Sequence, residues 1–237
     1  MRGRFLRLVL HSVYGSVVLA VAGCMTSPYH HPARSGPFFT PVNHVGEASL
    51  GGIRRVVLLP VWGGSLASSE TAAELDAVFV TALQRENRFE VVTLSRQETL
   101  RRFHAEALSA AAALPPDLLP MLQREYGAEA VMFVDLTAYR AYRPLAIGIR
   151  TKLATIDGTQ LLWTFDDNFS ASDPAVANSA RHYFLGDGGC LPTDLTPAVL
   201  QSPGRFATYA AAATFATLPP VSAGPPAKGR NAPAVAR

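Results

Sequence analysis

The chain has 237 residues, of which 49% are hydrophobic and 16% charged, and its formal net charge is +3. This length and composition are those of one globular domain with short extensions. The positive charge suggests a nucleic-acid partner, but three arginines lie within the first seven residues and three basic residues lie after Leu218. Between these two ends acidic side chains outnumber basic ones, so we expect no nucleic-acid binding.

The first 23 residues are typical of a secretory signal. Arginines are followed by an apolar stretch over residues 13–22, and small residues directly precede Cys24. The apolar stretch is shorter than the roughly 20 residues that a membrane-spanning helix needs. We therefore expect residues 1–23 to be a signal peptide that is removed during export.

Residues 21–24, Val-Ala-Gly-Cys, resemble the lipobox of bacterial lipoproteins. The resemblance implies that Cys24 is acylated, becomes the first residue of the mature protein and anchors it to a lipid bilayer. Met25 stands where inner-membrane retention in enteric lipoproteins usually calls for Asp. The resemblance thus implies the periplasmic side of the outer membrane. The alternative is an ordinary signal peptide with a chance cysteine.

Residues 24–52 contain four prolines and several glycines with little periodicity, and they predict a flexible tether. The neighbours His30 and His31 lie in this segment without further nearby ligands, so we expect no metal site there. Once Cys24 is acylated, Cys190 has no partner for an internal disulfide, and we expect it to be a small buried side chain.

The chain after the tether alternates strand and helix patterns. Apolar residues on both faces of the run 54–61 predict a central strand, and residues 88–94 predict another, with a capped helix between them. A second capping box opens at Ser95, and we expect its helix to continue through an alanine-rich stretch to about Ala113. A further helix is expected over residues 117–127.

Three more strands follow. Residues 130–136 are apolar on both faces and predict a strand beside the first one, at the centre of the sheet. Residues 147–153 and 161–165 alternate, and they predict a hairpin that is solvated on one face and lies toward the sheet edge. A three-residue loop ending in a left-handed glycine would pair Leu153 with Leu161.

Two further helices are expected to begin near Asp173 and Ser202, and the Pro/Ala/Gly-rich end is expected to be disordered. The predicted fold class is α/β, with a single mixed sheet of about five strands in the order β-α-β-α-β-β. Helices flank this sheet, and two additional helices follow at the C-terminal end. The predicted organisation has four parts: signal peptide 1–23, lipidated cysteine and tether 24–52, periplasmic α/β domain 53–218 and disordered tail 219–237.

No residue pattern in the sequence points to catalysis. Residues 62–65, Trp-Gly-Gly-Ser, lie where phosphate-binding loops occur but lack a lysine and both glycine signatures. The neighbours Asp166 and Asp167 lie on one strand and point to opposite faces, which argues against a catalytic carboxylate pair. Three other residues fit no metal-ligand spacing: His182, Asp187 and Cys190. We expect no enzyme activity, no cofactor and no metal.

The segment most suggestive of binding follows the third predicted strand. It combines two tyrosines with two arginines: Tyr139, Arg140, Tyr142 and Arg143. Both residue types are enriched at binding hot spots, so these are candidate partner-binding residues. A protein, an acidic glycan and a lipid headgroup all remain open as partners. The alternative is a simple connection whose tyrosines pack locally and whose arginines are solvated.

The order of elements from residue 56 to about residue 169 resembles a group of periplasmic domains. The group includes the curli-secretion channel lipoprotein, the N-terminal domain of the Tol translocation β-propeller protein and lipoprotein activators of peptidoglycan synthases. The matching segments are the strands at 56–60, 89–92 and 161–163 and the helix-to-strand junction at 126–131. The resemblance covers about half of the chain and implies a domain that works through binding and assembly, with no catalytic residues.

The sequence therefore predicts a non-catalytic lipoprotein of the outer membrane, on the periplasmic side. Its partners are the bilayer, through Cys24, and an envelope protein or a peptidoglycan-associated partner. One alternative is a subunit of an oligomeric export or secretion channel. Another is an envelope hydrolase, which would need polar residues to converge in one pocket: Ser65, Asp166, His182 and Asp187.

Overall fold

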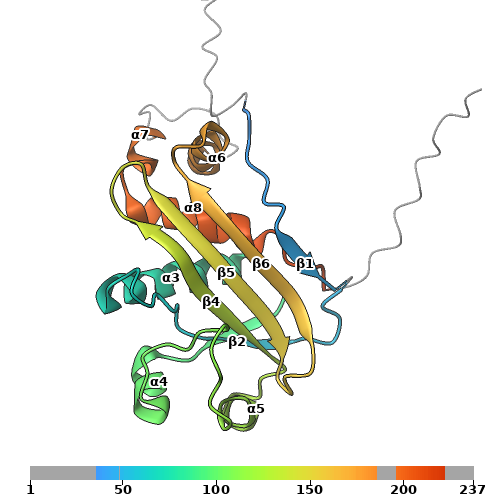
Figure 1. Cartoon of the computed structure of the whole chain (residues 1–237). Helices are drawn as coiled ribbons and strands as arrows, with labels where there is room; N and C mark the ends of the chain where they lie inside the picture. Colours follow the sequence, from blue (N-terminus) through green and yellow to red (C-terminus); the bar gives the residue numbers. More distant parts are fainter. Residues whose placement is uncertain (1–35, 48, 186–195, 222–237) are drawn as a thin grey trace, which may run out of the picture. The chain divides into compact units, whose positions relative to one another are not determined.

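The computed structural model describes residues 36–47, 49–185 and 196–221, which contain a six-stranded mixed sheet with helices packed on its faces (Figure 1). The strands are β1 (His44–Gly46), β2 (Arg55–Leu58), β3 (Glu90–Thr93), β4 (Ala130–Arg140), β5 (Ala146–Thr155) and β6 (Leu161–Ser170). The helices are α3 (Ser69–Arg85), α4 (Arg96–Phe103), α5 (Leu118–Tyr126), α6 (Pro174–Leu185), α7 (Thr196–Val199) and α8 (Pro203–Phe215). None of these helices combines the length and hydropathy of a membrane span.

The strands lie in the order β1-β6-β5-β4-β2-β3. Strand β2 is parallel to both β3 and β4. The other three pairs, β4 with β5, β5 with β6 and β6 with β1, are antiparallel. The predicted fold class, a single mixed sheet flanked by helices, is therefore confirmed, with β1 as an additional strand. The central place expected for β2 and β4 is also confirmed, because each has a strand on both sides.

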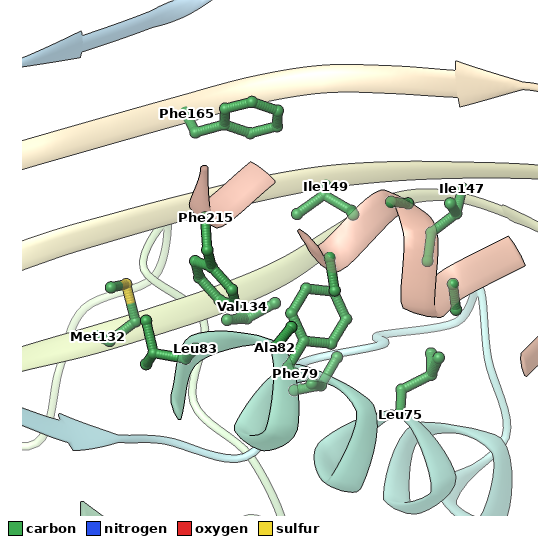
Figure 2. Packing of buried hydrophobic residues seen from close by; sticks show 14 of the residues in the cluster. Leu75, Phe79, Ala82, Leu83, Met132, Val134, Ile147, Ile149, Phe165 and Phe215 are labelled. Atoms are coloured by element: carbon green, nitrogen blue, oxygen red, sulfur yellow. The ribbon is translucent and has the colours of Figure 1, made fainter. Parts of the chain in front are cut away.

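Each face of the sheet carries its own apolar core. The larger core lies between the sheet and helices α3 and α8, and Figure 2 shows its side chains interdigitating, among them Leu75, Phe79, Leu83, Met132, Val134, Ile149 and Phe215. The smaller core lies on the opposite face, where α5 covers the alternate residues of the central strands: Val57, Leu59, Val131 and Phe133. Burial on both faces explains why the sequences of β2 and β4 are continuous apolar runs.

The β5–β6 hairpin differs from the prediction in its register. The predicted pair Leu153–Leu161 is wrong, because Leu153 pairs with Trp163 and a bulge follows, so that Ala154 pairs with Leu161. The extra residue of the bulge turns Leu161 toward solvent, where it is 55% exposed, while Trp163 stays buried as expected. The hairpin lies toward the sheet edge as predicted, although β1 and not β6 forms the edge itself.

The segment expected to be a tether contributes to the domain from residue 37 onward. Strand β1 pairs with β6, and before it the chain docks along α6, as Figure 1 shows. The Phe39 amide donates to Ser179 Oγ at 2.8 Å, and the Pro37 carbonyl accepts from Asn178 Nδ2 at 3.4 Å. Leu50 is fully buried, and its amide donates to the carbonyl of Pro220, so the first residues after 218 are also held. A three-residue strand has too little periodicity to be recognised.

The predicted extension of the second helix to Ala113 is wrong. Helix α4 ends at Phe103, and His104 caps it in the left-handed region with φ 57°. Residues 105–114, which we call the strap, then follow without forming a helix. Alanine is the best helix former, but helix propensity is a weak preference that long-range contacts override. Those contacts come from Asp135 on β4 and Lys152 on β5.

Candidate functional site

The two halves of the predicted binding segment behave differently in the structure. Tyr139 is half-buried against the larger core, and burial, helped by the charge of Glu74, raises the pKa of its hydroxyl. Arg140 Nε donates to the carbonyl of Pro144 and closes the turn. These two side chains therefore support the β4–β5 connection itself, as the alternative interpretation expects.

The other two predicted side chains point outward. Tyr142 is 74% exposed, and Arg143 is exposed as well. Within the part of the chain that the structure describes, the Arg143 guanidinium has no hydrogen bond and no ion pair. An exposed tyrosine offers a large contact area at a small cost in conformational entropy, and an unpaired guanidinium keeps its five N–H donors available. The exposed half of the segment is thus suited to contact with another molecule.

A depression of about 470 Å³ lies beside this segment. Its lining comes from the β4–β5 connection, the end of β6, helix α6 and the residues after α7: Arg143, Pro144, Ala171, Arg181, Leu200 and Gln201. Arg143 was predicted as a candidate, whereas the other lining residues were missed. No sequence signal identifies them, because their proximity arises only when the ends of distant elements fold together.

The arginines of the described residues fall into two groups. One group contacts carboxylates: Arg54, Arg55, Arg88, Arg96, Arg101, Arg102, Arg124 and Arg150. The other group contacts no carboxylate of the described residues: Arg85, Arg140, Arg143, Arg181 and Arg205. Most of the second group lies at one end of the domain, formed by the β4–β5 connection, α6 and the start of α8 (Figure 1). We call this the arginine end.

A second polar cluster lies on β4 and β5, under the strap. Asp135, which is 2% exposed, accepts hydrogen bonds from Ser109 Oγ at 2.6 Å and from the Ala110 amide at 3.3 Å. Lys152 Nζ donates to the carbonyl of Ala110 at 3.0 Å. Burial raises the pKa of Asp135, although these hydrogen bonds oppose the shift. Because both carboxylate oxygens are engaged, Asp135 holds the strap and offers no free oxygen for chemistry.

The strap also borders a depression of about 340 Å³ beneath Trp62. Gly64 has φ 53°, and a Cβ at this position would lie 2.7 Å from the Trp62 ring, so only glycine lets the turn pass so close to the indole. The lining of this depression is mainly alanine and leucine from the strap. The glycines of residues 62–65 therefore serve a packed turn.

The remaining sequence candidates lie on different elements. Asp166 on β6 pairs with Arg150, with Nε–Oδ2 at 2.8 Å. The ring of His182 on α6 lies against Phe38, at 4.9 Å between centroids, and Ser65 lies in the turn before α3. Among the described residues no three His, Cys, Asp or Glu side chains gather as metal ligands would. Five candidates fall outside the described residues: Cys24, His30, His31, Asp187 and Cys190.

The chain is similar in fold to several solved structures. A variant of the PelC dodecamer from Paraburkholderia phytofirmans has a TM-score of 0.39 and 10% identity, over 56% of this chain and 82% of that chain. Lipoprotein GNA1162 from Neisseria meningitidis has a TM-score of 0.38 and 16% identity, over 51% and 85%. The LpoB C-terminal domain from Escherichia coli has a TM-score of 0.33 and 18% identity, over 52% and 85%.

These proteins match the lipoprotein group that the sequence resemblance names, and the likeness concerns the fold alone. The chain matches no protein-family model and no curated protein.

Proposed function

We propose that this protein is a non-catalytic binding module of the bacterial cell envelope. An acylated Cys24 anchors it to the periplasmic side of the outer membrane, and its arginine end captures an envelope protein or a peptidoglycan-associated partner. The observation that carries the proposal is the exposure of Tyr142 and Arg143 beside a depression that includes a second arginine, Arg181.

Three physical properties support binding at this place. The depression has the volume of sites that hold a small ligand or a few side chains of a partner. Tyr142 and Arg143 belong to the residue types that dominate interface energetics. Finally, Tyr139 and Arg140 hold the base of the connection, so the exposed pair is presented from a supported turn and loses less entropy on binding.

The anchor is tested by the mass of the mature N-terminus and by cell fractionation. We expect the full chain, expressed in a Gram-negative host, to begin at an acylated Cys24 and to remain with the outer membrane. The variant Cys24→Ser should move to the soluble periplasmic fraction, whereas Cys190→Ser should leave membrane attachment unchanged. A mature protein with a free Cys24 thiol contradicts the proposed anchor.

The binding role is tested by crosslinking in intact cells. We expect the variant with Tyr142→Ala and Arg143→Ala to lose the proteins that crosslink to the wild type. The matched control replaces Leu100 and Arg101, an exposed leucine and arginine on α4, by alanine. Equal capture by all three proteins contradicts the role of the arginine end. Ring-sized particles of the purified protein in detergent would instead favour an oligomeric channel subunit.

A further inference from the structure

The two arginines of the depression line the same hollow, and neither contacts a carboxylate of the described residues. Most other guanidinium groups of the described residues contact a carboxylate, as does that of Arg96, whose Nε and Nη2 donate to the two carboxylate oxygens of Asp76 at 2.6 and 2.9 Å. Arg181 instead reaches only an amide oxygen, that of Asn178, at 3.3 Å, and Arg143 has no partner among the described residues. Two like charges that border one depression repel each other unless an anion lies between them.

The chemistry of the lining defines what such an anion must be. A guanidinium group presents a planar fork of N–H donors that matches a carboxylate in two-point geometry. The rest of the lining is apolar, from Pro144, Ala171 and Leu200, except for Gln201, whose amide can donate to and accept from a peptide backbone. A fitting ligand therefore combines carboxylates with a backbone and apolar side chains.

We infer that the arginine end binds an acidic peptide segment of the partner, with a carboxylate between Arg143 and Arg181 and an apolar neighbour against Leu200. This inference rests on the proposed function and specifies the chemistry of its partner. Tyr142, at the rim, adds an exposed aromatic ring for a second apolar contact.

An anionic bilayer suits the same end less well. Attraction to a lipid surface depends on a field of uncompensated positive charge over the whole surface. Asp173 begins α6 here by accepting from the Ala175 amide, and Glu74 is near enough to Tyr139 to raise its pKa. These carboxylates weaken the long-range field, whereas recognition by two guanidinium groups across a depression acts at short range.

Peptide binding to the full-length lipoprotein in detergent tests the inference. The probe is a fluorescent peptide of alternating Glu and Leu, followed by anisotropy, and the comparison peptide has Gln in place of every Glu. We expect only the acidic peptide to bind. Arg143→Ala and Arg181→Ala should each weaken binding about tenfold, the loss typical of one charge-assisted hydrogen-bonded contact. Lysine at either position should restore only part of the affinity, because the fork is lost.

The matched control is Arg101→Ala on α4, which should bind the peptide like the wild type. Because Arg181 is half-buried, the thermal midpoint of its variants is measured alongside, and Arg181→Gln serves as a variant that preserves more of the packing. Equal affinity for the Glu and Gln peptides overturns the inference. So does binding to phosphatidylglycerol vesicles that depends on both arginines while the acidic peptide does not bind.

Two different results would contradict the acidic ligand and the proposed function separately. Cellular crosslinks that are lost with Tyr142→Ala but retained with the Arg143 and Arg181 variants would keep the proposed function and overturn the acidic ligand. An absence of cellular crosslinks, together with arginine-dependent binding of the Glu peptide, would retain the ligand chemistry and contradict the function proposed for it.

Discussion

The hydroxyl of Ser109 donates a 2.6 Å hydrogen bond to Asp135, and this bond joins the strap to the sheet across 26 positions of the sequence. With the Ala110 amide on the other carboxylate oxygen and Lys152 on the Ala110 carbonyl, the backbone of the strap is held at its middle. A stretch made of the strongest helix former thus remains non-helical because buried polar groups need partners there.

Replacing Asp135 by Ala should therefore destabilise the domain. The change leaves the Ser109 hydroxyl and the Ala110 amide without their acceptor and removes the negative charge near Lys152. We expect a loss of about 3 kcal/mol in the free energy of unfolding. Urea denaturation measures the loss, and limited proteolysis should show faster cleavage within the strap. Asp117→Ala is the control, because Asp117 makes no side-chain capping bond and its removal should cost far less.

The raised pKa of Asp135 also predicts how the stability of the domain depends on pH. The pKa of Asp135 is raised in the folded state above its ordinary value of 3.8, so the folded protein holds this proton more tightly than the unfolded chain. The contribution of the group is fully present below that ordinary value and is lost as the pH rises through the folded-state pKa. The stability of the wild type relative to Asp135→Asn should therefore fall with rising pH in this interval. Thermal midpoints across a pH series measure it, and a difference that grows with pH contradicts the prediction.

The bulge in β4 makes Gly148 intolerant of a side chain. A Cβ there would lie 2.4 Å from Thr137 Oγ1 and 2.8 Å from the Ala138 amide nitrogen, so the strands must shift apart. We expect Gly148→Ala to lower the free energy of unfolding by about 1–3 kcal/mol. Gly204→Ala is the matched control, since a Cβ at this helical residue would meet nothing within 4 Å. That control should gain about 0.5–1 kcal/mol, and equal effects at the two glycines would refute the steric explanation.

Truncation tests where the domain begins. A chain that starts at Gly36 should keep the thermal midpoint of the wild type. A chain that starts at Glu47 lacks β1 and the contacts of residues 37–39 with α6, which bares the edge of β6. We expect this shorter chain to be less stable and to self-associate in size-exclusion chromatography, because an uncovered strand edge pairs with other chains. Identical thermal midpoints and elution volumes of the two proteins would instead support a domain that begins at residue 53.

The centre of the fold was predictable from the sequence because its signal is local. Residues 56–58 and 130–136 are apolar on both faces apart from Asp135, and short continuous runs of this kind are typical of strands covered on both sides. The bulge after Leu153 was not predictable, since two registers satisfy the same alternation of the hairpin. Strand β1 was missed because its residues are exposed and have no apolar face to detect.

The binding surface was predictable only in part. The composition of residues 139–143 identified one wall of the depression, and exposure then separated Tyr142 and Arg143 from their supporting neighbours. The opposite wall depends on Arg181 and Leu200, which no local pattern marks. Asp135 did leave a signal, a single acid within an apolar strand, and such a residue demands buried partners.

The contacts of residues 37–39 with α6 form a path by which force on the N-terminal segment would reach the domain. Asn178 contacts residues on both sides of this path: its Nδ2 donates to the Pro37 carbonyl, and its Oδ1 accepts from Arg181. Tension on the chain before Gly36 would reach α6 through Pro37 and Phe39 before it loads β1. Arg181, which borders the depression, therefore contacts the same asparagine that holds Pro37. Force on the N-terminal segment would first reach the domain at this asparagine.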